Sequence, residues 1–353
     1  MTHTTDVVVI GGGQAGLAAG YHLRREKLDF VILDAQNDPG GAWRHTWDSL
    51  HLFSPAAFSS LPGRLMPAQS GEEYPDAGHV VDYLADYEQR YGLPVLRPVR
   101  VDAVRPEGGR LRVEADAGVW SARAVISATG TWWRPFWPAV AGREVFTGRQ
   151  LHTTGYRRPA DFAGQRVIVV GGGNSGAQIA ADLALADAEL TWVTQRPARF
   201  LADDIDGRAL FDAATARRRA LDAGAADTGG VASLGDIVAV SPVRAARDAG
   251  LLKAQPMFQR LTSGGVEWAD GTTALADTVI WCTGFRPALS HLAPLGLRGA
   301  RGHIVTEGTR AVGEPRVHLL GYGDWIGPAS ATLIGVGRTA REMARDVALL
   351  LTR

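Results

Sequence analysis

The stretch that decides the fold is VVVIGGGQAG, residues Val7–Gly16. Its β-branched run predicts a buried strand, and the G-x-G-x-x-G pattern after it is typical of a turn into a helix whose amino end faces a pyrophosphate. The same arrangement recurs 160 residues later as VVGGGNSG, residues Val169–Gly176, preceded by Val167 and Ile168. One such loop holds one pyrophosphate, so the repeat predicts two dinucleotide sites. The candidate binding residues in the two loops are Gly11, Gly13, Gln14, Ala15, Gly16, Gly171, Gly173, Asn174, Ser175 and Gly176.

The two copies differ at the end of the following strand. Asp34 lies 18 residues beyond Gly16, where an acidic side chain accepts hydrogen bonds from ribose hydroxyls. Thr194 lies the same distance beyond Gly176 and carries no charge. The alternative interpretation of Asp34 is a solvated residue at a strand end.

Composition restricts the class of partner. The 353 residues hold 37 Lys and Arg against 37 Asp and Glu, so net charge does not favour nucleic acid or an anionic membrane. No apolar stretch reaches the ~20 residues of a membrane span, and the first strand leaves no room for a signal peptide, so we expect a cytoplasmic protein with a small-molecule partner. Cys282 is the only cysteine, which excludes a redox dithiol within the chain.

The predicted elements describe an α/β protein with two Rossmann-like units. The first unit has a strand at 6–10, a helix at 14–25, a strand at 30–33, a functional loop at 38–78, a helix at 79–91 and strands around 95–127. The second has a helix at 176–187, a strand at 190–194, an Arg-rich helical segment around 205–224, a Gly-rich loop near 223–235 and a final strand ending at Gly284. A strand at 317–320 and a helix at 331–351 are expected to return to the first unit. We therefore predict one three-layer domain at 1–150 and 286–353 with the domain 151–285 inserted in it.

Between the units lies FTGRQLHTTGY, residues Phe146–Tyr156. It fits the pattern F-x-G-x-x-x-H-x-x-x-[FY], and with the doubled glycine loop the chain resembles the bacterial flavin-containing monooxygenases of the single-component class B type, most closely the short members that accept NADH as well as NADPH. Tyr156, in place of the Trp of related Baeyer–Villiger enzymes, favours oxidation of heteroatoms. His152 and Tyr156, together with Phe53 in the earlier loop, are the candidate catalytic residues, with a linker role for His152 as the alternative.

The resemblance implies FAD at the first loop and NAD(P)H at the second. It also places further cofactor contacts near the flavin. Gly41 and Trp43 belong to the Gly40-Gly41-Ala42-Trp43 element, and Asp324 ends the Gly321-Tyr322-Gly323-Asp324 element. The remaining contacts are His51, Val101, Thr129 of a Thr-Gly element, Thr332 and Leu333. A second Thr-Gly element adds Cys282, Thr283 and Gly284. For Asp324 and Thr332 the alternatives are a capping residue and an ordinary helix start.

Three residues at the tip of the second nucleotide strand, Thr194, Gln195 and Arg196, bear on coenzyme choice. A carboxylate there would repel a 2′-phosphate, whereas Arg196 binds one through charge-assisted hydrogen bonds. We expect NADPH to be used, with Gln195 allowing NADH to compete. The alternative for Arg196 is an ordinary surface residue.

The resemblance also implies the reaction. Hydride passes from nicotinamide to flavin, O₂ adds to form a C4a-(hydro)peroxyflavin, and an oxygen atom goes to a soft nucleophile such as a sulfide, with weak Baeyer–Villiger activity as a further expectation. Phe53 stands where many relatives carry an Asn, which predicts leakage as hydrogen peroxide. Two rivals remain open: an NAD(P)H-dependent flavin reductase or oxidase acting on a quinone, metal or oxyanion, and a non-catalytic nucleotide-binding sensor.

Two further features carry open expectations. The aromatic run Thr131–Pro138 lines a substrate channel or forms a Pro-stiffened loop packed at the domain interface. An apolar aromatic surface makes a homodimer an expectation.

Overall fold

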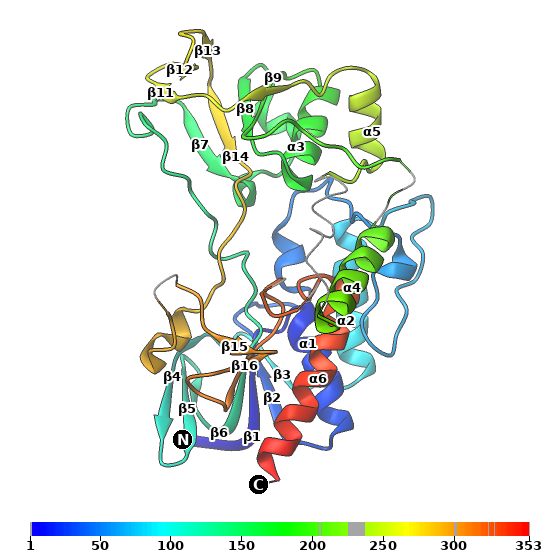
Figure 1. Ribbon diagram of the computed structural model, residues 1–353, viewed down its shortest axis with the longest axis vertical. Coiled ribbons are helices and arrows are strands. Elements are labelled where there is room, and N and C mark those ends of the chain that lie inside the picture. Colours follow the sequence, from blue (N-terminus) through cyan, green and yellow to red (C-terminus); the bar gives the residue numbers. More distant parts are fainter. Residues whose placement is uncertain are drawn as a thin grey trace.

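The structure is a computed structural model with two lobes, each built on its own sheet and joined by two long crossing segments (Figure 1). It describes residues 2–203, 205, 207–224, 237–299, 302–323, 325–327 and 329–352. Among these residues, no helix combines the length and apolarity needed to cross a membrane.

The first lobe is centred on parallel strands whose central β-branched residues, such as Val7, Val9 and Ile32, are fully buried. The hydrogen-bonded order runs β17-β6-β1-β2-β3, and the glycine loop follows the carboxyl end of β1. The strands are β1 (Thr2–Ile10), β2 (Phe30–Leu33), β3 (Val95–Leu96), β6 (Gly118–Ser127) and β17 (Val317–Leu319). Short antiparallel strands β15 (Thr306–Glu307) and β16 (Arg310–Ala311) extend the edge beyond β17.

Alternating side chains of β1 enter two different cores, which makes this lobe three-layered. Val7 and Val9 pack against α1 (Gln14–Arg25), α2 (Ala77–Arg90) and α6 (Leu333–Leu351). Val8 and Ile10 face the opposite side, where β4 (Val101–Glu107), β5 (Arg110–Ala115) and the short helix η6 (Ser290–Leu295) cover the sheet. The expected three-layer arrangement is thereby confirmed.

The second lobe repeats the parallel core in a smaller form. Its sheet has the order β10-β9-β8-β14-β7, with every neighbouring pair parallel. The strands are β7 (Arg149–His152), β8 (Arg166–Val170), β9 (Glu189–Thr194), β10 (Ala254–Pro256) and β14 (Thr278–Trp281). Helices α3 (Asn174–Leu185) and α5 (Ser241–Asp248) pack on one face of this sheet. A small antiparallel sheet packs on the other face and consists of β11 (Arg260–Thr262), β12 (Gly265–Glu267) and β13 (Thr273–Leu275).

After β14 the chain returns to the first sheet, because β17 pairs with β6 and α6 packs on α1. The second sheet is therefore inserted between two parts of the first lobe, as the sequence predicts. The two crossings are tied together: Trp132 stacks on Phe285 with ring centroids 5.2 Å apart, and the Thr129 hydroxyl donates to Ala288 O at 2.6 Å. The aromatic run 131–138 thus packs at the domain junction, in agreement with the structural alternative.

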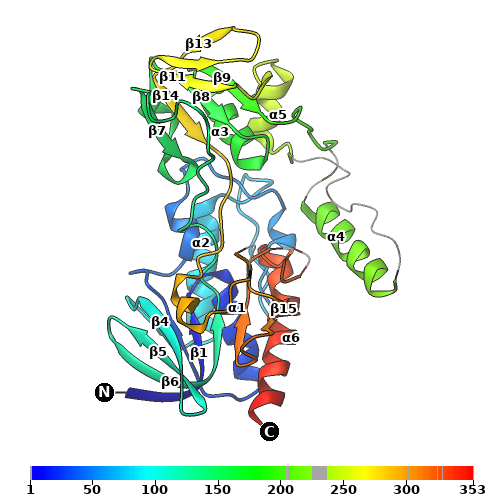
Figure 2. The same ribbon diagram turned by 60° about the vertical axis from the view of Figure 1, so that its left-hand side comes forward.

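Helix boundaries differ from the predicted ones by one or two residues: α2 and α3 both begin two residues early. The Arg-rich segment forms α4 (Gly207–Asp222), which projects from the body in Figure 2 and contacts α6 through a hydrogen bond from Arg338 to Thr215 Oγ1 at 3.2 Å. Most of the Gly-rich loop near 223–235 lies outside the described residues.

Candidate functional site

The first glycine loop, Gly11–Gly16, forms a tight turn in which side chains at Gly11 and Gly16 would collide with the backbone. Gly11 has φ +106°, and a Cβ there would lie 2.6 Å from Ala128 O. A Cβ on Gly16 would lie 1.9 Å from Gly11 O, so the third glycine is required by the turn itself. Gly13 caps α1 with no side-chain hydrogen bond, and the first-turn N–H groups of α1 are left for an anion.

The second loop has the same construction. Gly171 has φ +146°, and a Cβ there would lie 2.3 Å from Cys282 O, while a Cβ on Gly176 would lie 2.2 Å from Gly171 O. The cap of α3, Gly173, has open space where a Cβ would stand and makes no side-chain cap hydrogen bond. Trp192 Nε1, on β9, donates to Gly171 O at 2.8 Å and so fixes the start of the turn.

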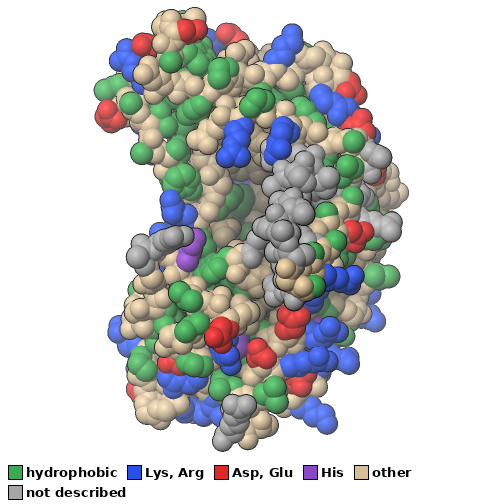
Figure 3. All heavy atoms as spheres, in the orientation of Figure 1, with side chains coloured by type: hydrophobic (Ala, Val, Ile, Leu, Met, Phe, Trp, Pro, Cys, Tyr) green, Lys and Arg blue, Asp and Glu red, His purple; other side chains and the backbone are tan. Residues whose placement is uncertain are grey.

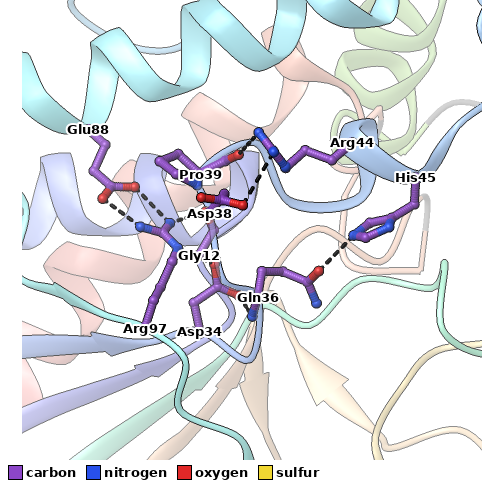
Figure 4. Close-up of polar contacts among 9 residues, drawn as sticks. All are labelled: Gly12, Asp34, Gln36, Asp38, Pro39, Arg44, His45, Glu88 and Arg97. Carbon is purple, nitrogen blue, oxygen red and sulfur yellow. Dashed lines mark hydrogen bonds and ion pairs between the residues drawn. The ribbon is translucent and has the colours of Figure 1, made fainter.

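Asp34 is buried at the end of β2, with a side chain 6% exposed. Its carboxylate accepts a hydrogen bond from Arg97 Nε at 2.8 Å, and Arg97 also binds Glu88 of α2 through both terminal nitrogens (Figure 4). This burial and pairing exclude the solvated alternative for Asp34. Neither Arg97 nor Glu88 was a sequence candidate, because Arg97 follows a strand of only two residues.

A hydrogen-bonded chain joins two candidates, Trp43 and Gln14, to the residue before Thr332. Trp43 Nε1 donates to Gln14 Oε1 at 2.8 Å, and Gln14 Nε2 donates to Ala331 O at 2.6 Å. Gly41 lies against Gly13, since its Cβ would be 2.8 Å from Gly13 Cα. The short helix η1 (Gly41–His45) is thereby attached to the amino ends of both α1 and α6.

Helix α6 begins at Leu333, two residues later than predicted, and its amino end has the ordinary helix start given as the alternative for Thr332. Thr332 is the N-cap and accepts from Gly335 N at 3.0 Å, and Leu333 is the first, buried, helical residue. Ala15 is buried against Gly321, where a Cβ would come within 2.7 Å of it. Asp324 lies outside the described residues. Val101 is the first residue of β4 and contacts the core on the far side of the sheet from α1.

The specificity candidates of the second lobe lie at the carboxyl end of β9. Thr194 is buried and pairs with Pro256 of β10, whereas Gln195 and Arg196 are exposed beyond it. Asn174 Oδ1 accepts from Val238 N at 2.8 Å, which places the chain after 237 beside the loop. Ser175 follows in the first turn of α3.

His152 lies between the two crossings. Its Nε2 is 3.0 Å from Gly284 O, its ring meets Phe285 edge-on at 5.0 Å, and Nδ1 is buried without a hydrogen-bond partner in the described part of the chain. Burial lowers the pKa of His152, so the imidazole is neutral near pH 7. The linker role therefore has direct geometric support. Thr283 contributes to the same junction by donating to Phe136 O at 2.6 Å.

Tyr156 is fully buried and donates to Asp182 Oδ2 of α3 at 2.6 Å. Burial, with the neighbouring Asp182 carboxylate, raises the pKa of Tyr156 far above its usual range, so this phenol remains protonated. Cys282 is also inert as a nucleophile, because burial raises the pKa of its thiol to about 12.

The loop after η1 docks on the second lobe. Ser49 donates to Asp182 Oδ2 at 2.8 Å, and the backbone of His51 exchanges hydrogen bonds with the Gln178 amide of α3 at 3.3 and 3.1 Å. Phe53 packs against the core of the second lobe. The His51 ring is 2.9 Å from Ser49 O and 3.4 Å from Glu72, so its polar contacts are with this loop region.

Thr129 belongs to a buried polar network that sequence reasoning missed. The Tyr322 hydroxyl lies 2.8 Å from Thr129 Oγ1 and 2.7 Å from Ser127 Oγ, which is 3.0 Å from His291 Nε2. Burial lowers the pKa of His291 to about 4. The network fixes the start of the first crossing against the start of η6.

Together these elements form a site between the lobes. The carboxyl ends of β1 and β8, with their glycine loops, face the region that separates the two sheets, and the space-filling view is hollowed there with Lys or Arg side chains along the upper rim (Figure 3). Two uncapped helix ends and a positive rim suit two anionic dinucleotides.

Comparison with known proteins extends this description. The family model for pyridine nucleotide-disulphide oxidoreductases matches residues 8–206. A solved flavin-containing monooxygenase from Stenotrophomonas maltophilia is 54% identical, covers 99% of both chains and superimposes with a TM-score of 0.90. An uncharacterized CzcO-like oxidoreductase from Geobacillus kaustophilus is 31% identical over 98% of this chain and 99% of its own. The indole-3-pyruvate monooxygenase YUCCA4 of Oryza sativa is 30% identical over 96% of this chain and 86% of its own.

Proposed function

Since the chain belongs to the pyridine nucleotide-disulphide oxidoreductases, and within them to the flavin-containing monooxygenases, we propose that it uses FAD, NAD(P)H and O₂ to oxygenate soft nucleophiles such as sulfides. The observation that carries the proposal is the pair of tight glycine turns, each before a helix without a side-chain cap. A small-molecule substrate enters between the lobes.

FAD is assigned to the first loop, in a domain of residues 1–150 and 286–353. Its pyrophosphate fits the turn at Gly11–Gly16, and its adenosine ribose fits the carboxylate of Asp34, which is buried and ready to accept hydrogen bonds. The Gln14–Trp43 contact and the amino end of α6 border the same loop, beside which we place the flavin ring. When bound, the flavin supplies the hydride acceptor and the reaction with O₂.

NAD(P)H is assigned to the second loop, in a domain of residues 151–285 whose first strand, β7, spans the limit at 150. Thr194 offers no charge to repel a 2′-phosphate, and the exposed Arg196 supplies a partner for it. Gln195 at the same tip serves the free hydroxyl of NADH. We therefore expect both coenzymes to be used, with NADPH preferred.

The residues of the chain orient the reactants and exclude water, and we assign none of them to proton transfer. His152 is neutral, the Tyr156 hydroxyl is protonated and bonded to Asp182, and the partly buried Cys282 thiol has a raised pKa. The apolar ring of Phe53, in a loop held by the second lobe, offers no polar contact to a reacting oxygen. We accordingly expect part of the reducing equivalents to appear as hydrogen peroxide.

The first test of this function is spectroscopic. NADPH mixed anaerobically with the purified, yellow protein is expected to bleach the flavin, and admission of air is expected to restore its absorbance. A colourless protein with no NADPH turnover would instead support a nucleotide-binding role without catalysis.

A further inference from the structure

Arg97 lies between two carboxylates in the interior of the first lobe. Its Nε donates to Asp34 Oδ2 at 2.8 Å, and Nη1 and Nη2 donate to the two oxygens of Glu88 at 2.6 and 2.7 Å (Figure 4). The three side chains are only 10%, 6% and 17% exposed for Arg97, Asp34 and Glu88. In such a setting the forked guanidinium holds both carboxylates in fixed directions.

The backbone fixes Arg97 beside Asp34 as well. Asp34 N donates to Leu96 O at 3.0 Å, and Val99 N donates to Asp34 O at 2.8 Å. The segment 96–99 is thus bonded to the backbone of Asp34 on both sides of Arg97. These main-chain hydrogen bonds hold the backbone of Arg97 beside Asp34, and the bonds to Asp34 and Glu88 hold its guanidinium.

The ion pair lies directly against the glycine loop. A Cβ on Gly12 would lie 2.6 Å from Asp34 Oδ2 and 2.9 Å from Arg97 Nη2. Arg97 occupies Oδ2, while Oδ1 receives only a long contact of 3.4 Å from Gln36 N among the hydrogen bonds of the described chain. An ionised carboxylate has about four acceptor positions, so Asp34 keeps capacity for ribose hydroxyls next to the loop.

The repeat supplies an internal comparison. In the second lobe the counterpart of Asp34 is Thr194, and the residue paired with it on the neighbouring strand is Pro256. Proline has neither charge nor side-chain donor, so the acid and its arginine are absent together from the second loop. This joint replacement indicates that Arg97 serves the acid of the first loop and not the Rossmann unit in general.

We propose that Arg97 is a positioning residue for FAD, acting through Asp34 on the hydroxyls of the adenosine ribose. The proposal rests on the assignment of FAD to the first loop. Arg97 pairs with the charge of Asp34 through Oδ2, leaves Oδ1 with acceptor capacity and is itself held by Glu88. Without Arg97, the buried carboxylate loses its charge partner and its fixed direction, and its hydrogen bonds to the ribose weaken.

The test is titration of the deflavinated enzyme with FAD and with an FAD analogue whose adenosine ribose lacks both hydroxyls. Arg97→Gln is expected to raise the Kd for FAD about 10- to 100-fold, with less than about a threefold change for the analogue. Arg97→Lys, which keeps the charge and loses the fork, is expected to fall between Arg97→Gln and the unmodified enzyme. Arg316→Gln is the matched control, because Arg316 forms a bidentate pair with Glu314 just before β17, at the opposite end of that strand from the loop.

The possible outcomes distinguish the positioning role of Arg97 from the proposed function. If the unmodified enzyme does not bind FAD, the proposed function fails first. If it binds FAD but Arg97→Gln weakens FAD and the analogue equally, Arg97 supports only the fold and the positioning role is overturned. Should Arg97→Gln not fold, the Asp34→Asn/Arg97→Gln pair of substitutions removes both charges, and its Kd for FAD should equal that of Asp34→Asn alone.

Discussion

The hydroxyl of Tyr156 donates a 2.6 Å hydrogen bond to Oδ2 of Asp182, the same oxygen that accepts from Ser49 at 2.8 Å. Tyr156 ends the motif between the lobes, Asp182 lies on α3, and Ser49 belongs to the loop that carries Phe53. One carboxylate oxygen therefore connects the junction, the second lobe and a loop that the sequence places in the first.

Substitution of Tyr156 by Phe tests this connection. Loss of a buried, charge-assisted hydrogen bond is expected to lower the free energy of unfolding by about 1–3 kcal/mol. Asp182→Ala should cost more, because both Tyr156 and Ser49 lose their acceptor. Chemical denaturation measures both effects, with the exposed Arg158→Ala as control. Equal stability of Tyr156→Phe and the unmodified protein would mean that the contact does not hold the lobes.

The two middle glycines of the repeat give a matched pair of substitutions. In Gly12→Ala the new Cβ would lie 2.6 Å from Asp34 Oδ2, whereas in Gly172→Ala it would lie 3.3 Å from the Thr194 methyl group, which has room to shift. Gly12→Ala is expected to weaken FAD binding at least about tenfold, and Gly172→Ala to change the KM for NADPH by less than about threefold. A smaller effect of Gly12→Ala than of Gly172→Ala contradicts the assignment.

Coenzyme preference should depend on Arg196. Replacement by Gln is expected to lower kcat/KM for NADPH about five- to tenfold and to leave that for NADH nearly unchanged, because only NADPH carries the 2′-phosphate. Steady-state kinetics with both coenzymes decides the matter. A parallel loss for both would assign Arg196 to another role.

Buried histidines predict how stability depends on pH. Burial lowers the pKa of His291 and of His318 to about 4, so between pH 6.5 and 4 the unfolded chain binds protons that the folded chain does not. Stability is therefore expected to fall as the pH drops through this window, by up to about 1.4 kcal/mol per pH unit for each histidine. Denaturation at pH 7, 6 and 5 measures the slope, and His318→Gln should flatten it. An unchanged stability from pH 7 to 5 would contradict the prediction.

Local patterns predicted most of the fold. The β-branched runs before each glycine loop became β1 and β8, the acid 18 residues beyond Gly16 lies buried at the end of β2, and the last predicted helix became α6. These features depend on short-range chemistry that a sequence displays directly. The inserted arrangement was also predicted, because the second glycine loop interrupts a unit that a late strand and helix complete.

The missed parts of the site depend on contacts between distant segments. Arg97 meets Asp34 across 63 positions and Tyr322 meets Ser127 across 195, and no periodicity marks either residue. The docking of Ser49 on Asp182 is of the same kind. A comparison of the two repeats would have found Arg97. It directly follows the short strand beside β2, and the residue at the same place in the second repeat is the uncharged Pro256.

We propose that this chain transfers an oxygen atom from O₂ to a soft nucleophile. The most direct test is turnover with NADPH and a thioether under ¹⁸O₂, followed by mass spectrometry of the product. We predict a sulfoxide that carries one ¹⁸O atom. NADPH oxidation with all the oxygen recovered as hydrogen peroxide, or with electrons passed to a quinone and no labelled product across a panel of thioethers, would contradict the claim and favour a reductase or oxidase.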